Sequence, residues 1–205
     1  MSLYHLNEKS LYFIHIPRTS GRYVRSLIES TPSISCHYNI PGQDYIRGRD
    51  VVHLHYPLYE HFLPTYKIPQ ITIVRNPIDK FISCIKVMCH MHHFDYNFIM
   101  KTKEEFDMFV WLNIDALSFQ NNWFLPQHRF TSSITKVWKY EDGINEDFVD
   151  WVREETGMQI SKDFSVNYDK INGEEESFDY KMDEHIKDYI VDFYKEDFLK
   201  FGYTF

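Results

Sequence analysis

The sequence predicts a single α/β domain over residues 1–205, built on a three-layer parallel sheet with helices on both faces. Short apolar and β-branched runs alternate along the chain with segments of helical periodicity. That alternation is typical of parallel α/β folds. The 205 residues, 43% hydrophobic and 25% charged, suit one folded domain. Aromatic residues make up 18% of the chain and supply bulky groups for its core.

The first half of the chain shows three strand signals and one helix signal. Residues 11–16 are apolar and aromatic and are followed by Pro17, which predicts a buried strand. A helix is expected from about Gly21 to Glu29. Residues 50–55 predict a second strand and residues 70–74 a third.

The helix after the third strand has the clearest start signal. Asn76 is a good N-cap and Pro77 suits the first helical position. The apolar positions of this helix recur with helical spacing, so this face is expected to pack on the sheet. These positions are Ile78, Phe81, Ile82, Ile85, Cys89 and His92.

Four further elements are expected in the second half of the chain. Residues 104–121 predict a helix and residues 134–140 a late strand. Residues 147–155 and 183–200 predict two more helices.

Charge is divided unevenly along the chain. The net charge is −8, which argues against a nucleic-acid partner. Residues 1–100 hold 10 basic and 7 acidic side chains, and residues 101–205 hold 12 and 23. A site for an anionic ligand is therefore expected in the first half.

Three cysteines are too few for a disulfide framework. No stretch approaches the roughly 20 apolar residues of a membrane span, and residues 1–9 lack the layout of a signal peptide. The sequence therefore predicts a cytoplasmic protein without a membrane span.

The junction after the first strand has the residues of an anion-binding loop. Residues 17–22 read Pro-Arg-Thr-Ser-Gly-Arg. Backbone N–H groups at such a junction point towards an anion, with the hydroxyls of Thr19 and Ser20 and the guanidinium of Arg18 around it. The Gly-x-x-x-x-Gly-Lys-Ser/Thr pattern is absent, which disfavours a small-molecule kinase.

A second junction follows the third strand. Arg75 ends this strand, and Ser83 lies about two turns into the next helix, off its apolar stripe. An arginine and a hydroxyl that converge make a good phosphate clamp. Each half of this clamp is also compatible with a purely structural role.

Taken in order, the two junctions resemble those of sulfotransferases that use 3′-phosphoadenosine 5′-phosphosulfate (PAPS). The likeness is in particular to the branch that includes the heparan sulfate 2-O-sulfotransferases and related carbohydrate enzymes. Residues 13–22 are similar to the Phe-x-His-Ile-Pro-Lys-Thr-Gly-Gly-Thr-like loop of that family, and Arg75 with Ser83 to its Arg-and-Ser motif. Residues 53–57, His-Leu-His-Tyr-Pro, resemble a segment between these motifs, and residues 138–142 and 193–203 resemble late ones.

The resemblance implies a P-loop-like sulfotransferase fold and transfer of the sulfuryl group of PAPS to an acceptor hydroxyl, without a metal. A carbohydrate or another small metabolite is the expected acceptor. His55 is the expected general base, with His53 as the second candidate, and Arg18 the cation at the leaving group. The 3′-phosphate is assigned to Arg75 and Ser83. The 5′-phosphosulfate is assigned to Arg18, Thr19, Ser20, Gly21 and Arg22.

Two departures from the family pattern leave an alternative open. Arg18 replaces the family lysine, and an arginine cannot give up a proton. Ser20 replaces the first glycine, which narrows backbone freedom. A non-catalytic module that binds 3′,5′-bisphosphonucleotides is therefore the alternative function.

Two other groups of residues are weaker site candidates. Cys89 and His93 have the i,i+4 spacing of a zinc pair, but Cys89 also belongs to the apolar stripe. Gln127, His128 and Arg129 follow Pro126 and are expected to reach the nucleotide.

Overall fold

The computed structural model describes residues 2–37, 45–46, 49–50, 53, 56, 67–92, 99–112, 122–165 and 183–204. The chain divides into two compact units. The first unit contains Met1–Arg75 and Gln127–Tyr168, and the second contains Asn76–Pro126 and Asp169–Phe205. That these units form a single domain stays a prediction.

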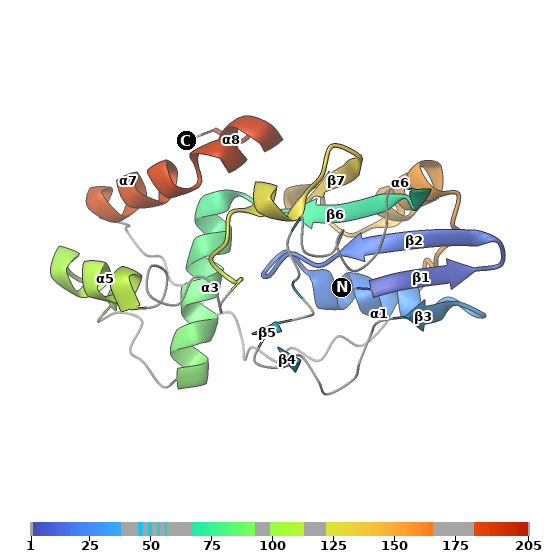
Figure 1. Ribbon diagram of the computed structural model, residues 1–205, viewed down its shortest axis with the longest axis horizontal. Coiled ribbons are helices and arrows are strands. Elements are labelled where there is room, and N and C mark those ends of the chain that lie inside the picture. Colours follow the sequence, from blue (N-terminus) through green and yellow to red (C-terminus); the bar gives the residue numbers. More distant parts are fainter. Residues whose placement is uncertain are drawn as a thin grey trace. The chain divides into compact units, whose positions relative to one another are not determined.

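The first unit is built on a five-stranded sheet with the order β3-β1-β2-β6-β7. The pairs β2–β6 and β6–β7 are parallel, whereas β1 runs antiparallel to both of its neighbours. Figure 1 shows the arrowheads of β2 and β6 at one end of the sheet and that of β1 at the other. The strands are β1 (Ser2–Leu6), β2 (Lys9–Ile14), β3 (Ser35–His37), β6 (Gln70–Val74) and β7 (Thr135–Lys139).

An entirely parallel sheet is therefore the wrong prediction. The antiparallel strand β1 forms a hairpin with β2, in which Leu6 pairs with Lys9. Asn7 in the turn between them has a φ of 54°. Asparagine tolerates this left-handed conformation better than most residues, and tight hairpin turns require it. The strands expected over residues 11–16, 70–74 and 134–140 are confirmed within two residues at each end.

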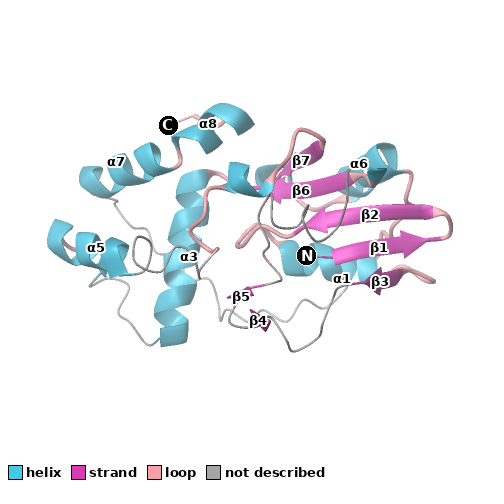
Figure 2. Cartoon of the chain, viewed as in Figure 1, coloured by secondary structure: helices cyan, strands magenta, loops and turns pink. Residues whose placement is uncertain are grey.

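Helices α1 (Gly21–Glu29) and α6 (Glu146–Thr156) pack on one face of this sheet (Figure 2). Both predicted helices are confirmed. The mixed α/β class is thereby confirmed as well. The opposite face, with Tyr12, Ile14 and Val74, is also buried, but a second helical layer stays a prediction. The shared core includes Leu11, Phe13, Val24, Leu27, Ile28, Ile71, Ile73, Phe148, Val149 and Val152.

The strand expected over residues 50–55 is wrong. β4 (Tyr45–Ile46) and β5 (Arg49–Asp50) form a separate two-stranded ribbon. His53 lies in a turn, so an extended strand does not continue through it. Two short 3-10 helices, η3 (Gln127–Phe130) and η4 (Tyr140–Asp142), also belong to the first unit.

The second unit is helical in its described residues. It contains α3 (Pro77–His92), α5 (Lys103–Val110), α7 (Glu184–Phe193) and α8 (Lys195–Phe201). The predicted start of α3 is confirmed, because the Ile78 N–H donates to Asn76 Oδ1 at 3.0 Å. The helix expected over residues 104–121 is confirmed as far as Val110, and residues 113–121 lie outside the described part.

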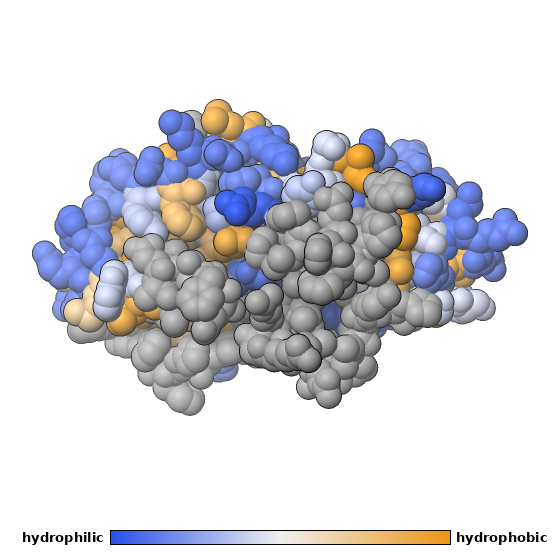
Figure 3. Space-filling model, in the orientation of Figure 1, coloured by the Kyte–Doolittle hydropathy of each residue, from blue (hydrophilic) through white to orange (hydrophobic). Residues whose placement is uncertain are grey.

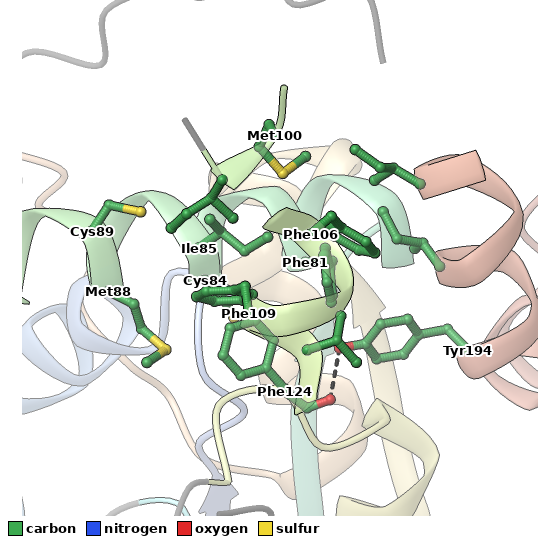
Figure 4. Packing of buried hydrophobic residues seen from close by; sticks show 14 of the residues in the cluster. Phe81, Cys84, Ile85, Met88, Cys89, Met100, Phe106, Phe109, Phe124 and Tyr194 are labelled. Atoms are coloured by element: carbon green, nitrogen blue, oxygen red, sulfur yellow. Dashed lines mark hydrogen bonds between the residues drawn. The ribbon is translucent and has the colours of Figure 1, made fainter. Parts of the chain in front are cut away.

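The apolar stripe of α3 packs against other helices of the second unit, and its expected packing on the sheet stays a prediction. Phe81, Ile85 and Cys89 enter a cluster formed with α5, α7 and α8. Figure 4 shows Phe81 close to Phe106 of α5, with Phe124 and Tyr194 beside them. The periodicity identified the buried face correctly, and the partners within the second unit are helices.

Buried hydrogen bonds tie the segment before η3 to these helices. The ammonium group of Lys80, which is fully buried, donates to the carbonyls of Trp123 at 2.8 Å and Leu125 at 3.2 Å. The Tyr194 hydroxyl donates to the Phe124 carbonyl at 2.6 Å (dashed in Figure 4). Tyr194 also separates α7 from α8, so the single helix expected over residues 183–200 is wrong.

The surface of the described residues is mainly hydrophilic in the view of Figure 3, with smaller apolar areas between the polar ones. Among the described residues, no helix has the length and apolar character needed to cross a membrane.

Candidate functional site

Two of the predicted ligand-binding segments lie at the same edge of the first unit's sheet. β2 and β6 are parallel neighbours, and Ile14 pairs with Thr72 near the carboxyl ends of both strands. The loop of residues 15–20 follows β2, and Arg75 follows β6 directly. In α/β sheets ligands bind outside the carboxyl ends of parallel strands. This edge is therefore the candidate site.

The loop after β2 has an unusual backbone. Arg18 has a φ of 66°, and Ser20 has φ 63° and ψ 19°. A left-handed conformation costs a residue with a side chain roughly 1–2 kcal/mol relative to the right-handed one. A glycine would adopt the conformation of Ser20 without this cost. Backbone strain of this kind is concentrated at functional sites.

The start of α1 offers backbone donors to an anion. The first hydrogen bond of the helix runs from the Val24 N–H to the Ser20 carbonyl at 3.1 Å. The N–H groups of the preceding three residues therefore have no partner within the helix. The Ser20 side chain does not cap them, the first turn has no acidic residue, and Arg22 is exposed there. An anion at this end would be stabilised by these donors and by the helix dipole.

Thr19 plays a different part from the one expected. Its side chain is buried, and its hydroxyl donates to the Ile16 carbonyl at 2.9 Å. The hydroxyl hydrogen is therefore used inside the loop and is not offered to an anion. Thr19 closes the turn that brings Arg18, Ser20 and Gly21 together.

Arg75 is held by two residues of the first unit. Its N–H donates to Gln127 Oε1 at 2.9 Å, and its carbonyl accepts from Gln127 Nε2 at 2.7 Å. The guanidinium carbon lies 4.5 Å from the centre of the Tyr140 ring. Arg75 Nε is buried and has no hydrogen-bond partner among the described residues. A partly exposed arginine with an unsatisfied donor is suited to an anionic ligand.

His15 is a buried histidine at the centre of the candidate site. Its side chain is 5% exposed, and Nδ1 has no hydrogen-bond partner among the described residues. Burial lowers the pKa of His15 well below its usual range, and the nearby positive groups of His53, Arg25 and Arg22 lower the pKa further. His15 is therefore neutral at physiological pH.

His15 connects α1 to His53. A Cβ atom on Gly21 would lie 1.9 Å from Cδ2 of His15, so any larger residue at the start of α1 would have to displace the His15 ring. The His15 ring also contacts the His53 ring edge-on, with the ring centroids 4.6 Å apart. His53 thus lies one ring away from the start of α1, where an anion would bind. His55 lies outside the described residues.

Tyr56, three residues after His53 in the chain, is connected to η3. The Tyr56 N–H donates to the Arg129 carbonyl at 2.9 Å. Gln127, in the same short helix, binds the backbone of Arg75. Gln127 is expected to reach the nucleotide; one donor and one acceptor site of its amide bind the backbone of Arg75, and a contact with the nucleotide stays a prediction.

Other predicted site residues lie in the second unit or outside the described residues. Ser83 is buried on α3 in the second unit, so its pairing with Arg75 stays a prediction. His93 of the zinc pair lies outside the described residues. Within the described part of the chain, no group of three or more histidine, cysteine or acidic side chains is placed to hold a metal ion.

Sequence reasoning missed the contribution of His15 and Tyr140. His15 sits at the end of an apolar strand, where its own polarity was the available signal. Tyr140 was noted only as part of a late motif. Its position beside Arg75 follows from the pairing of Val74 with Lys139, which the sequence does not reveal.

Comparison with known proteins gives no relative. No protein-family model matches the chain, and no curated protein or solved structure matches it either. The sulfotransferase resemblance therefore rests on the motifs of the sequence alone.

We predict that Gly21→Ala destabilises the protein by roughly 1–3 kcal/mol, the usual cost of overpacking, because the new methyl group meets the His15 ring. An alanine in a helix would otherwise be stabilising. Urea unfolding of Gly21→Ala, His15→Ala and the double variant measures this contact. Most of the cost of Gly21→Ala should disappear in the His15→Ala background. Strictly additive effects would contradict the contact.

We predict that His15 makes the protein sensitive to mild acid. Because the pKa of His15 is lower in the folded protein than in the unfolded chain, the unfolded chain binds the proton first as the pH falls. The contribution of neutral His15 to the free energy of unfolding should be fully present above about pH 6.5. Below this pH the free energy of unfolding should decrease by up to about 1.4 kcal/mol per pH unit. Urea unfolding between pH 7.5 and pH 5 should show a smaller decrease for His15→Phe. The exposed-site control His90→Gln should keep the original slope, and an unchanged slope in His15→Phe would contradict the assignment.

Proposed function

We propose that this protein is a PAPS-dependent sulfotransferase that transfers the sulfuryl group to an acceptor hydroxyl. One observation carries the proposal. The parallel pairing of β2 with β6 brings the loop of residues 15–20 and Arg75 to one edge of the sheet. These are the two segments that resemble the 5′-phosphosulfate and 3′-phosphate motifs of that family. A nucleotide with phosphates at both its 5′ and 3′ positions requires two such anion sites.

Different residues of the chain are proposed to bind the two ends of the nucleotide. The N–H groups at the start of α1, with Arg18 and Arg22, would hold the 5′-phosphosulfate, and Arg75 would hold the 3′-phosphate. Charge develops on the bridging oxygen as the sulfur–oxygen bond breaks, in analogy to phosphoryl transfer. Arg18 is the cation proposed to stabilise that charge. The bisphosphate leaves while the acceptor oxygen bonds to sulfur and loses its proton to a base.

A histidine near neutral pH is the natural base for the acceptor hydroxyl. Motif position favours His55, and the described geometry supports His53. The neutral His15 ring orients His53 without competing for a proton, since burial keeps His15 unprotonated. A carbohydrate or small metabolite remains the proposed acceptor, and the cytoplasm the proposed location.

The alternative is a module that binds 3′,5′-bisphosphonucleotides without turnover. The specific observation in its favour is Arg18, which replaces a lysine and has a left-handed backbone. Arg18 keeps the positive charge but cannot donate a proton to the leaving group. Both functions use the same anion sites, so they differ in the transfer step alone.

We predict that the protein binds 3′,5′-bisphosphoadenosine more tightly than 5′-AMP or ATP, and that Arg75→Ala removes this preference. Loss of a buried charged contact should cost roughly 2–5 kcal/mol for the bisphosphate. Calorimetric titration with the three nucleotides provides the measurement. Arg153→Ala is the matched control, because Arg153 is an exposed residue of α6 paired with Asp150. Equal affinity of the unaltered protein for bisphosphate and 5′-AMP would refute the proposal.

We predict that alanine in place of the true base slows sulfuryl transfer by roughly 10²–10⁴-fold with nearly unchanged bisphosphate affinity. His53→Ala and His55→Ala are compared by release of 3′,5′-bisphosphoadenosine from PAPS in the presence of a panel of sugars and small alcohols. A loss in one variant identifies the base. Full transfer in both variants would exclude both histidines, and tight binding without transfer by the unaltered protein would favour the binding module.

A further inference from the structure

Gln127 completes the end of β6 with its side chain. The last paired residue of β6 is Val74, opposite Lys139 of β7. Arg75 follows, and the Gln127 amide binds both its N–H and its carbonyl, at 2.9 and 2.7 Å. Gln127 is fully buried. Its side chain thus makes the two hydrogen bonds that a residue of a neighbouring strand would make. These bonds fix the backbone from which the Arg75 side chain extends.

Tyr140 holds the guanidinium group of Arg75. It follows Lys139, the partner of Val74, so strand pairing itself brings it beside Arg75. The guanidinium carbon lies 4.5 Å from the ring centre, a distance typical of a cation–π contact. The ring covers a face of the guanidinium, so ligands can approach only where the ring leaves it open.

An arginine has four rotatable side-chain bonds and loses much conformational entropy when it is fixed. Bonds from a guanidinium to phosphate depend on direction, because its donors form a rigid planar fork. An Arg75 already held at its backbone and at its guanidinium therefore loses less freedom on binding.

We propose that Gln127 and Tyr140 are positioning residues that give Arg75 its selectivity for the 3′-phosphate. The inference rests on the proposed function, and it assigns roles that the motif resemblance does not contain. Neither residue needs to touch the nucleotide. Gln127 acts through the backbone of Arg75 and Tyr140 through its guanidinium.

The test of Gln127 is Gln127→Met, which keeps the side-chain length and removes both hydrogen bonds. Gln70→Met is the matched control. Gln70 is a buried glutamine at the opposite end of β6, and its Oε1 accepts from the hydroxyls of Ser132 and Thr135, both at 3.0 Å. Thermal unfolding without ligand reports the structural cost of each change. Calorimetry reports the ratio of the Kd for 5′-AMP to the Kd for 3′,5′-bisphosphoadenosine.

We expect Gln127→Met to lower this ratio about tenfold or more, by analogy with the roughly 10–100-fold loss of metal affinity when a group that orients a metal ligand is removed. Gln70→Met should lower the melting temperature similarly and keep the ratio. If both variants keep the ratio, or both lower it equally, the role of Gln127 is overturned while the proposed function stands. If the unaltered protein has no preference for the bisphosphate, the proposed function fails together with this inference.

Tyr140 has its own matched pair of variants. Tyr140→Phe keeps the aromatic face and should keep the ratio. Tyr140→Leu removes the face and should lower the ratio roughly 2- to 30-fold, the range of a cation–π contact. Equal behaviour of the two variants would overturn the role of Tyr140. This comparison also remains interpretable if Gln127→Met does not fold.

Discussion

The parallel pairing of β2 with β6 is the constraint on which the candidate site depends. β6 is buried along its whole length and β2 from Leu11 to Ile14, as expected for parallel strands in an α/β protein. Their register is reinforced by a side-chain bond, in which the Thr72 hydroxyl donates to the Ile14 carbonyl at 2.8 Å. Because both strands run in the same direction, the loop before α1 and Arg75 emerge at one edge. A shift of this register would separate the two proposed phosphate sites.

The polar groups of this edge differ from those in the second unit's core. There, the buried Lys80 and Tyr194 find carbonyl partners in residues 123–125. At the candidate site, His15 Nδ1 and Arg75 Nε lack hydrogen-bond partners among the described residues, and Ser20 keeps a strained φ. An unsatisfied buried donor costs stability, and a bound anion would satisfy the donor of Arg75 Nε. The acid sensitivity predicted for His15 follows from its burial in the same arrangement.

Local sequence signals predicted much of the fold. The Asn76-Pro77 start of α3, the buried strand β6 and helix α1 follow directly from short-range rules of capping, burial and periodicity. The errors have long-range causes. The partners of the α3 stripe and the break at Tyr194 depend on contacts between distant segments, which periodicity cannot identify. The antiparallel pairing of β1 with β2 depends on the turn at Asn7. The sequence contains this hairpin signal, but the prediction did not use it.

In the candidate site, too, local features could be predicted from the sequence and contacts between distant residues could not. The loop of residues 17–22 and Arg75 were identified from strand ends and residue types, since anion sites reuse these local features. The roles of Gln127 and Tyr140 arise from residues 52 and 65 positions away from Arg75 in the chain, and a single sequence does not reveal such pairs. Thr19 was assigned to the anion because its hydroxyl suits one, but the loop's own carbonyl at Ile16 binds that hydroxyl first.

The most direct test of the account is a crystal structure of the protein with 3′,5′-bisphosphoadenosine. The account predicts the 5′-phosphate on the N–H groups at the start of α1 and the 3′-phosphate on the Arg75 guanidinium, with Tyr140 still against it. A nucleotide bound elsewhere, or a 3′-phosphate that makes no contact with Arg75, would contradict it.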